Sequence, residues 1–171
     1  MAKRALSGLK VVDYGSFISA PYCTKLMADL GAEVIKVEEP KKGDESREYG
    51  PFPNDIPYPE RSGLFLYLNT NKLGITLNVG TATGREILKQ LLKESDIFVE
   101  NNYPKLIDEV CLDYVNLKGL NPRLIVTSIT SFGQTGPYRD YKAYPINCCA
   151  VGGVSQSIGH HWRMPLTAPL S

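Results

Sequence analysis

Several adjacent residues are of the types found in metal or thiol sites. His160 and His161 lie beside Trp162, and Cys148 is followed by Cys149. Adjacent side chains in an extended chain point in opposite directions, and no third ligand is spaced to join the two histidines. We expect the histidines in a surface loop, the cysteines as small core residues of a helix that ends in a turn, and no metal site.

Phosphate-binding patterns are incomplete in this sequence. A dinucleotide site needs three glycines at fixed spacing, and residues 14–21 contain only Gly15. A phosphate-binding P-loop is absent. Glu38 ends a predicted strand, where a ribose-binding acid would lie, but acids are common there. Lys72 and Lys142 lie in predicted loops, where either side chain can pair with a phosphate, although a single loop lysine is usually solvated.

The composition excludes some classes of partner. Lys and Arg number 19 against 18 Asp and Glu, which gives a net charge of +1. This balance favours neither nucleic acid nor an anionic membrane, and it is compatible with a phosphorylated small molecule. The apolar runs are far shorter than the roughly 20 residues of a membrane span, and the N-terminus lacks a secretory signal pattern. The four cysteines fit neither a zinc nor a disulfide framework, so we expect reduced thiols and a cytoplasmic protein.

Predicted strands and helices alternate along the chain. Residues 9–13, 33–38, 74–79, 96–100 and 124–128 have the apolar pattern of strands. The first helix has an expected apolar face of Tyr22, Leu26, Met27 and Leu30, with Ser19 near its N-cap, Pro21 in its first turn and Gly31 at its C-cap. A second helix begins near Thr83, which forms a capping box with Glu86. Shorter helices are expected near Leu106 and Tyr114, and residues 39–61 form a long loop.

This order predicts an α/β fold with a doubly wound, mostly parallel, Rossmann-like sheet. Ligands of such sheets bind beyond the carboxyl ends of the strands. The segments expected to hold a ligand are therefore residues 14–21, 38–44, 78–83, 101–104 and 128–144.

Six sequence blocks in order, covering nearly the whole chain, carry a family resemblance. They are residues 8–13, 20–21 with 28–38, 69–72 with 74–77, 96–101, 121–125 and 133–137. With these blocks the chain resembles the class III CoA-transferase family, which includes formyl-CoA transferase and carnitine CoA-transferase. The resemblance implies that residues 1–171 are the N-terminal part of the CoA-binding large domain. It also implies that these residues do not include the small domain and the C-terminal return segment of the family, and that full-length members form interlocked homodimers.

The resemblance also implies a binding site for coenzyme A, as substrate and product. By position it comprises Ile18, Ser19, Leu77, Asn78, Asn101, Asn102, Tyr103, Lys142, Ala143 and Tyr144. Lys142 is the residue most suited to hold a CoA phosphate, because its ammonium group is a compact point charge. For Asn101 a role as a strand-end turn residue is an equal alternative.

The resemblance implies covalent catalysis by an aspartate. This residue follows a Gly-Gly turn and a Pro-Leu segment, here Gly152-Gly153 and Pro165-Leu166, so its position lies just beyond Ser171. We therefore expect no catalytic residue among residues 1–171 and no activity from this polypeptide alone. The partners implied are an acyl-CoA and a carboxylic acid.

Some positions depart from the family pattern. Leu73 stands where the family usually has Arg, Glu39 and Glu109 stand at basic positions, and the Phe-x-Pro-Gly motif reads Asn102-Tyr-Pro-Lys105. Replacing cations by carboxylates weakens attraction for an anionic ligand. Two alternatives follow. One is an α-methylacyl-CoA racemase-like enzyme, which would need a Gly-His-Asp where this chain has Ala143-Tyr144-Pro145. The other is a non-catalytic CoA-binding module.

Overall fold

A computed structural model describes residues 4–158, 160 and 162–163 of the chain. The chain divides into two compact units, Met1–Thr130 and Ser131–Ser171, which are described separately. Within the described residues, no helix has the length and apolar character needed to cross a bilayer.

The first unit is built on a five-stranded sheet in which every neighbouring pair is parallel. Its order is β3-β2-β1-β4-β5, and its strands are β1 (Lys10–Tyr14), β2 (Glu33–Glu38), β3 (Leu73–Thr76), β4 (Ile97–Glu100) and β5 (Ile125–Ser128). The predicted parallel α/β sheet is confirmed. The third strand was predicted too long, because the chain leaves the sheet after Thr76.

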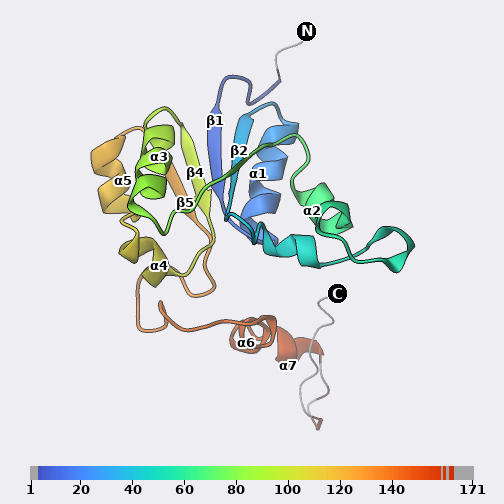
Figure 1. Cartoon of the computed structure of the whole chain (residues 1–171). Helices are drawn as coiled ribbons and strands as arrows, with labels where there is room; N and C mark the ends of the chain where they lie inside the picture. The colour runs from blue at the N-terminus through green and yellow to red at the C-terminus, as the bar shows by residue number, and fades with distance from the viewer. Residues whose placement is uncertain (1–3, 159, 161, 164–171) are drawn as a thin grey trace. The chain divides into compact units, whose positions relative to one another are not determined.

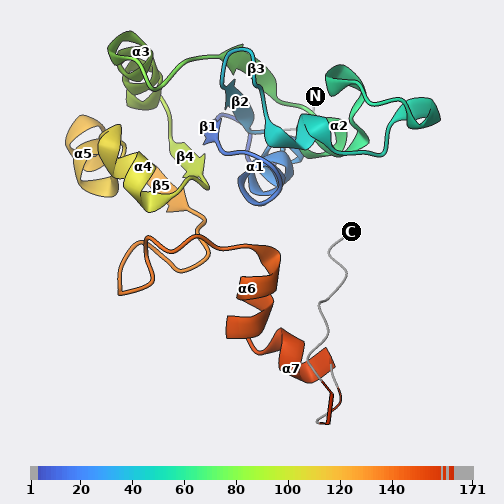
Figure 2. The ribbon, with the colours of Figure 1, turned by 60° about the horizontal axis from the view of Figure 1, so that its bottom comes forward.

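Helices cover both faces of this sheet, as a doubly wound fold requires (Figures 1 and 2). On one face lies α1 (Ser19–Asp29), with α2 (Gly63–Leu68) beside it, and on the other lie α3 (Ala82–Lys93), α4 (Pro104–Glu109) and α5 (Tyr114–Leu120). Two apolar cores result. Phe98 packs with Leu88 and Leu117 on the second face, whereas Val11 and Ala28 belong to the core under α1.

The buried face of α1 differs from the prediction. Tyr22, Leu26 and Leu30 are 43%, 47% and 50% exposed, so three of the four expected apolar residues face outward, whereas Met27 is half-buried and packs against the core. The buried positions are instead Ala20, Pro21, Thr24 and Ala28. Small side chains let the helix backbone approach the sheet closely, and this requirement decides the face more strongly than side-chain size. The C-cap prediction is supported, since Gly31 has φ +100° directly after the helix.

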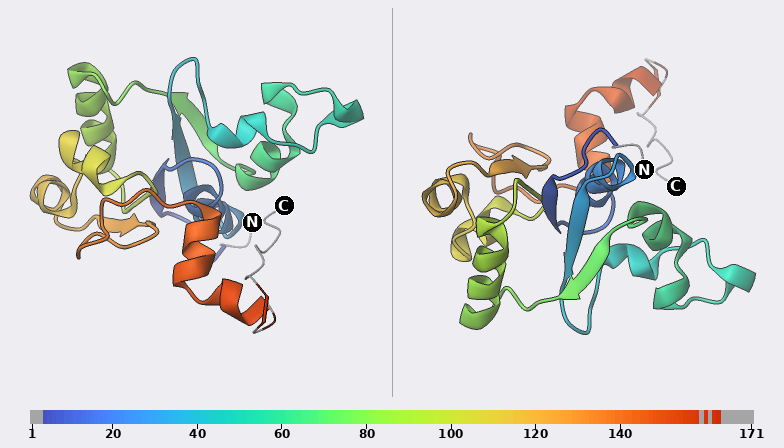
Figure 3. Two further views of the ribbon diagram at one scale, coloured as in Figure 1. Left: turned by 90° about the horizontal axis from the view of Figure 1, so that it is seen from below. Right: turned by 90° about the horizontal axis from the view of Figure 1, so that it is seen from above.

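Two further local predictions change. The N-cap of α3 is Thr81, whose hydroxyl accepts a hydrogen bond from the Gly84 amide at 3.0 Å, so the expected Thr83–Glu86 capping box is wrong. The long segment after β2 contains three one-turn 3₁₀ helices, η1 (Glu45–Glu48), η2 (Pro53–Asp55) and η3 (Pro59–Arg61). Figure 3 shows this segment, together with α2, extending beyond the edge of the sheet.

The described part of the second unit contains two short helices, α6 (Pro145–Val151) and α7 (Val154–Ile158). Cys148 is exposed and Cys149 half-buried, so the expectation of two core cysteines is wrong for Cys148. The His160 ring stacks on Trp162 at 4.9 Å between centroids. His161, Pro165 and Leu166 lie outside the described residues.

Candidate functional site

The strand order reverses direction between β1 and β4, and this is where such sheets bind ligands. The chain runs outward from β1 to β2 and β3, then returns to β4 on the other side of β1. The loops after β1 and β4 therefore separate toward opposite faces and leave a crevice at the carboxyl edge. Residues 15–17, called here the β1–α1 turn, lie on one side of this point, and Asn101 and Asn102 lie on the other.

Asn101 holds the β1–α1 turn through its side-chain amide. Its Oδ1 accepts a hydrogen bond from the Ser16 amide at 2.8 Å, and its Nδ2 donates to the Ser16 carbonyl at 2.8 Å and to Ser19 Oγ at 2.9 Å. An asparagine amide has two N–H donors, and both are used here. The alternative of Asn101 as a turn residue is therefore supported by its contacts, which leave no side-chain donor for a ligand.

The backbone packs closely where β1 ends. A Cβ atom on Gly15 would lie 2.3 Å from Ala20 Cβ and 2.9 Å from Asn101 Oδ1, so this position requires glycine. Beside it, Asn102 Nδ2 donates to the Tyr14 carbonyl at 2.8 Å. The close approach brings α1, β1 and the β4 loop together at one point.

Glu100 is a fully buried carboxyl at the end of β4. Its Oε2 accepts a hydrogen bond from the Asn102 amide at 2.7 Å. Burial raises the pKa of Glu100 above its ordinary value. Hydrogen bonds to Ser128 and Asn102 oppose this rise only in part. Burial also raises the pKa of Tyr14, with the charges of Glu39 and Glu100 acting in the same direction.

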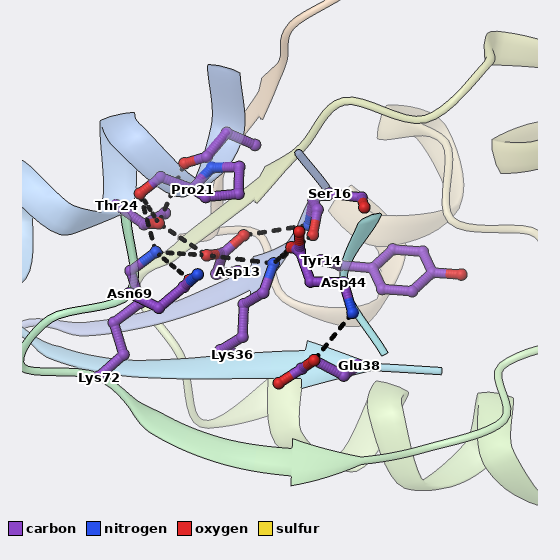
Figure 4. Close-up of polar contacts among 12 residues, drawn as sticks. Asp13, Tyr14, Ser16, Pro21, Thr24, Lys36, Glu38, Asp44, Asn69 and Lys72 are labelled. Carbon is purple, nitrogen blue, oxygen red and sulfur yellow. Dashed lines mark hydrogen bonds and ion pairs between the residues drawn. The ribbon is translucent and has the colours of Figure 1, made fainter. Parts of the chain in front are cut away.

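Asp13 and Lys72 form a buried ion pair under the start of α1 (Figure 4). Lys72 Nζ lies 2.9 Å from Asp13 Oδ2 and also donates to the Pro21 carbonyl at 2.8 Å and to Asn69 Oδ1 at 2.9 Å. Its side chain is 1% exposed, so the expectation of a solvated loop lysine is wrong. Burial lowers the pKa of Lys72, and the charge of Asp13 opposes that effect.

Lys36 and Asp44 form a second buried pair in the same network. Lys36 Nζ is 2.5 Å from Asp44 Oδ2, 2.5 Å from the Gly15 carbonyl oxygen and 3.9 Å from Asp13 Oδ2. Although burial opposes ionisation of Asp44, the neighbouring charge of Lys36 and its hydrogen bonds hold the pKa of that carboxyl below its ordinary value. The network therefore joins β1 and β2 to the loop that follows β2.

Glu38, at the end of β2, is engaged by Arg47 rather than free for a ribose. Arg47 binds it in bidentate fashion, with Nε at 2.7 Å from Oε2 and Nη2 at 2.9 Å from Oε1. The amide of Asp44 donates to the same carboxylate at 2.9 Å. Burial would raise the pKa of Glu38, but the hydrogen bonds and charge of Arg47 hold it below its ordinary value.

A cavity of about 210 Å³ opens between these loops. Its lining combines polar and charged groups with the apolar side chains of Val37 and Leu106: Tyr14, Gly15, Ser16, Lys36, Val37, Glu38, Glu39, Lys42, Gly43, Asp44, Asn102 and Leu106. Pockets for drug-sized ligands are usually above ~300 Å³, so this cavity has room for part of a CoA-sized molecule. Glu39 and Lys42 are the exposed charged residues of the lining.

The structure brings together one group of the predicted site residues. Ser19 and Asn101 are hydrogen-bonded, Ile18 is the N-cap of α1, and Asn102 lines the cavity. Tyr103 is the exposed N-cap of α4 in the same loop.

The remaining predicted residues are not part of the cavity lining. Leu77 and Asn78 follow the outer strand β3 at the same carboxyl edge, where the Leu77 amide donates to the carbonyl of Glu38 and Asn78 Oδ1 accepts from the Gly80 amide. Lys142, Ala143 and Tyr144 belong to the second unit, where Lys142 and Tyr144 are exposed and Ala143 is half-buried.

Sequence reasoning missed the buried ion network. Lys36 interrupts the apolar strand Val-Ile-Lys-Val, and a lysine in a buried strand needs a partner. In the parallel pairing of β1 and β2, Asp13 lies directly opposite Lys36. This combination of a strand lysine and a strand aspartate was the available signal.

Comparison with known proteins identifies the family of this chain. The model of CoA-transferase family III matches residues 6–171. The chain belongs to CoA-transferase family III. Its relatives include the formyl-CoA:oxalate CoA-transferase of Escherichia coli, 39% identical over 163 residues that make up 95% of this chain and 38% of that protein. The succinyl-CoA–D-citramalate CoA-transferase of Chloroflexus aurantiacus is 38% identical over 168 residues, 98% of this chain and 41% of that protein.

A solved structure of a relative supports the fold. The CAIB/BAIF family protein of Brucella suis superimposes with a TM-score of 0.85 at 35% identity, over 99% of this chain and 44% of that one. The chain thus spans about two fifths of the length of the relatives it matches.

Proposed function

We propose that this protein transfers CoA between an acyl-CoA thioester and a free carboxylic acid through an aspartyl covalent intermediate. Residues 1–171 contribute the N-terminal part of the CoA-binding large domain, and the full-length protein acts as a homodimer in the cytoplasm. The observation that carries the proposal is the carboxyl-edge site of a family III chain, where Asn101 holds the β1–α1 turn beside a cavity. The partners are an acyl-CoA and a carboxylic acid, with no nucleic acid, membrane or metal.

The proposed reaction consists of successive acyl transfers. An aspartate carboxylate attacks the thioester carbonyl of the donor, and the CoA thiolate leaves to give a mixed anhydride. The thiolate then attacks the aspartyl carbonyl, releasing the donor acid and forming an aspartyl-CoA thioester. The acceptor carboxylate attacks that thioester, and the returning thiolate takes the acceptor acyl group and frees the aspartate. In each step one bond to an acyl carbon breaks and another forms. No oxidation state changes, so no external redox partner is needed.

Residues 1–171 serve CoA binding in this scheme rather than bond breaking. We propose that the aspartate lies outside these residues and that Asp140, in an exposed loop beside Arg139, is not the nucleophile. A racemase would instead need a histidine as general acid and base, and Ala143-Tyr144-Pro145 supplies none. We therefore expect this polypeptide to bind CoA without exchanging it.

Calorimetric titration with CoA and an exchange assay test the proposal together. The assay uses formyl-CoA with oxalate and succinyl-CoA with D-citramalate, the pairs in the names of two relatives. Saturable CoA binding without exchange is the expected result for residues 1–171. Exchange by this polypeptide would contradict the position of the nucleophile, and no CoA binding would contradict the site itself.

A further inference from the structure

One buried ion pair connects two walls of the cavity. The first wall is the β1–α1 turn, and the second is the loop of residues 43–46, called here the β2 loop. Lys36 Nζ contacts both, at 2.5 Å from the Gly15 carbonyl oxygen and 2.5 Å from Asp44 Oδ2. The Lys36 and Asp44 side chains are 2% and 0% exposed. A single ammonium group thus fixes the separation of the two loops.

The second oxygen of Asp44 completes the connection. Asp44 Oδ1 accepts hydrogen bonds from the Phe17 amide at 3.1 Å, the Ser46 amide at 2.8 Å and the Ser46 hydroxyl at 2.6 Å. The carboxylate therefore bonds to the turn through Phe17 and to its own loop through Ser46. Together with the Lys36 contact, it joins the two walls at two separate points.

The β1–α1 turn needs such support to keep its conformation. Phe17 has φ +66°, in the left-handed region that is unfavourable for a residue with a bulky side chain. The turn's polar backbone groups are held mainly by side chains: the Gly15 amide donates to Asp13 Oδ1 and the Ser16 amide to Asn101. Without Lys36 and Asp44, the Gly15 carbonyl and the Phe17 amide would lose these partners, and Phe17 could relax.

A buried ion pair is a poor source of stability, because removing two charges from water offsets most of their attraction. Its specific effect is on geometry, since the charged groups tolerate few alternative arrangements. Here that geometry is the shape of a cavity whose lining includes Gly15, Ser16, Lys36 and Asp44.

We infer that Lys36 and Asp44 are positioning residues of the CoA site, which set the separation of the β1–α1 turn and the β2 loop before the ligand binds. The inference rests on the proposed function, because CoA is the ligand whose affinity reports the geometry. Neither side chain needs to contact CoA.

A charge-neutral double variant, Lys36→Met with Asp44→Asn, tests this role. It removes one cation and one anion together, so Asp13 keeps Lys72 as its partner and no net charge is left buried. The matched control is Lys25→Met with Asp29→Asn, which removes an ion pair of the same two residue types within α1, away from the cavity. Calorimetry measures CoA affinity, and amide hydrogen exchange reports residues 15–17 and 43–46 without ligand.

The double variant is expected to bind CoA about tenfold more weakly or worse and to exchange faster in both segments, while the control changes neither. Unchanged affinity in a folded double variant would show a purely structural pair and overturn the inference. Weaker binding without faster exchange would mean direct ligand contact and overturn it as well. No CoA binding by the wild type would overturn the proposed function, and with it the assignment of this pair to a CoA site.

Two measurements keep the inference testable if the double variant does not fold. Asp44→Asn alone retains an acceptor for Phe17, and it is expected to show the same changes at smaller size. In the ligand-free wild type, the amides of Gly15, Ser16 and Phe17 are expected to be protected from exchange. Exchange of these amides at the rate of an unstructured loop would overturn the inference.

Discussion

The side chain of Asn101 forms two hydrogen bonds with the backbone of Ser16, a residue 85 positions earlier in the chain. One bond satisfies the Ser16 amide and the other its carbonyl, both at 2.8 Å. This reciprocal arrangement imitates the pairing of two strands and continues the contact between β1 and β4 beyond the point where the ladder ends. Asn101 therefore shapes the site through the turn.

Replacement of Asn101 by alanine is expected to weaken CoA binding about tenfold and to lower the free energy of unfolding by about 1–3 kcal/mol. The reason is that the half-buried amide and carbonyl of Ser16 lose their partners. Calorimetric titration and urea unfolding measure the two effects. Asn116→Ala, on the exposed surface of α5, is the matched control. Normal CoA affinity in a folded Asn101→Ala protein would show that the turn does not govern binding.

Charge reversal at Glu39 is expected to tighten CoA binding. This exposed carboxylate lines the cavity, and Glu39→Lys would replace repulsion of an anionic ligand by attraction. Surface charge pairs contribute about 0.2–1 kcal/mol each, so the gain should be several-fold at low salt and should diminish as salt is added. Glu33→Lys, at the opposite edge of the sheet, makes the same charge change as a control. An equal gain in both variants would indicate only a nonspecific effect of net charge.

Replacement of Lys72 by methionine is expected to destabilise the fold by about 3–5 kcal/mol, because the buried carboxylate of Asp13 loses its nearest cation. Urea unfolding followed by circular dichroism gives the free energy. The exposed Lys105 of α4 provides the comparison, and Lys105→Met should change stability by less than about 0.5 kcal/mol. Equal, small losses in the free energy of unfolding of both variants would indicate that Lys72 is a solvated loop lysine.

The raised pKa of Glu100 predicts a pH-dependent gain from Glu100→Gln. The unfolded chain releases this proton at lower pH than the folded protein, so ionisation costs the wild type stability as pH rises from the unfolded value through the folded one. Glutamine does not titrate. The unfolding free energy of the variant minus that of the wild type should therefore increase as pH rises above the ordinary range of a glutamate carboxyl. A constant or decreasing difference would contradict the buried, destabilised carboxylate.

Much of the sheet was predictable because each parallel strand carries its own apolar signal. Residues 33–38 were predicted at the bounds that β2 has, and the parallel α/β arrangement followed from the alternation of strands and helices. The face of α1 was not predictable in this way. Its largest apolar residues, Tyr22 and Leu26, are outside, and the close approach of the helix to the sheet selects Ala20 and Ala28.

The site was only partly predictable from the sequence. The strand-end rule located Ser19, Asn101 and Asn102 near one another, since it depends on topology alone. The role of Asn101 and the burial of Lys72 depend on partners 85 and 59 residues away, which no local pattern reveals. Lys142 to Tyr144 remain a prediction based on family resemblance.

The most direct measurement of the central claim is a titration of the ¹⁵N-labelled protein with CoA, followed by amide chemical shifts. We predict saturable changes in amide chemical shift at the carboxyl edge, in residues 15–19, 39–44 and 101–103, together with residues 142–144. Amides at the opposite edge, such as those of Glu33 and Ile97, should remain unchanged. Shifts confined to that opposite edge, or no shifts at saturating CoA, would contradict the assignment of a CoA site to this part of the fold.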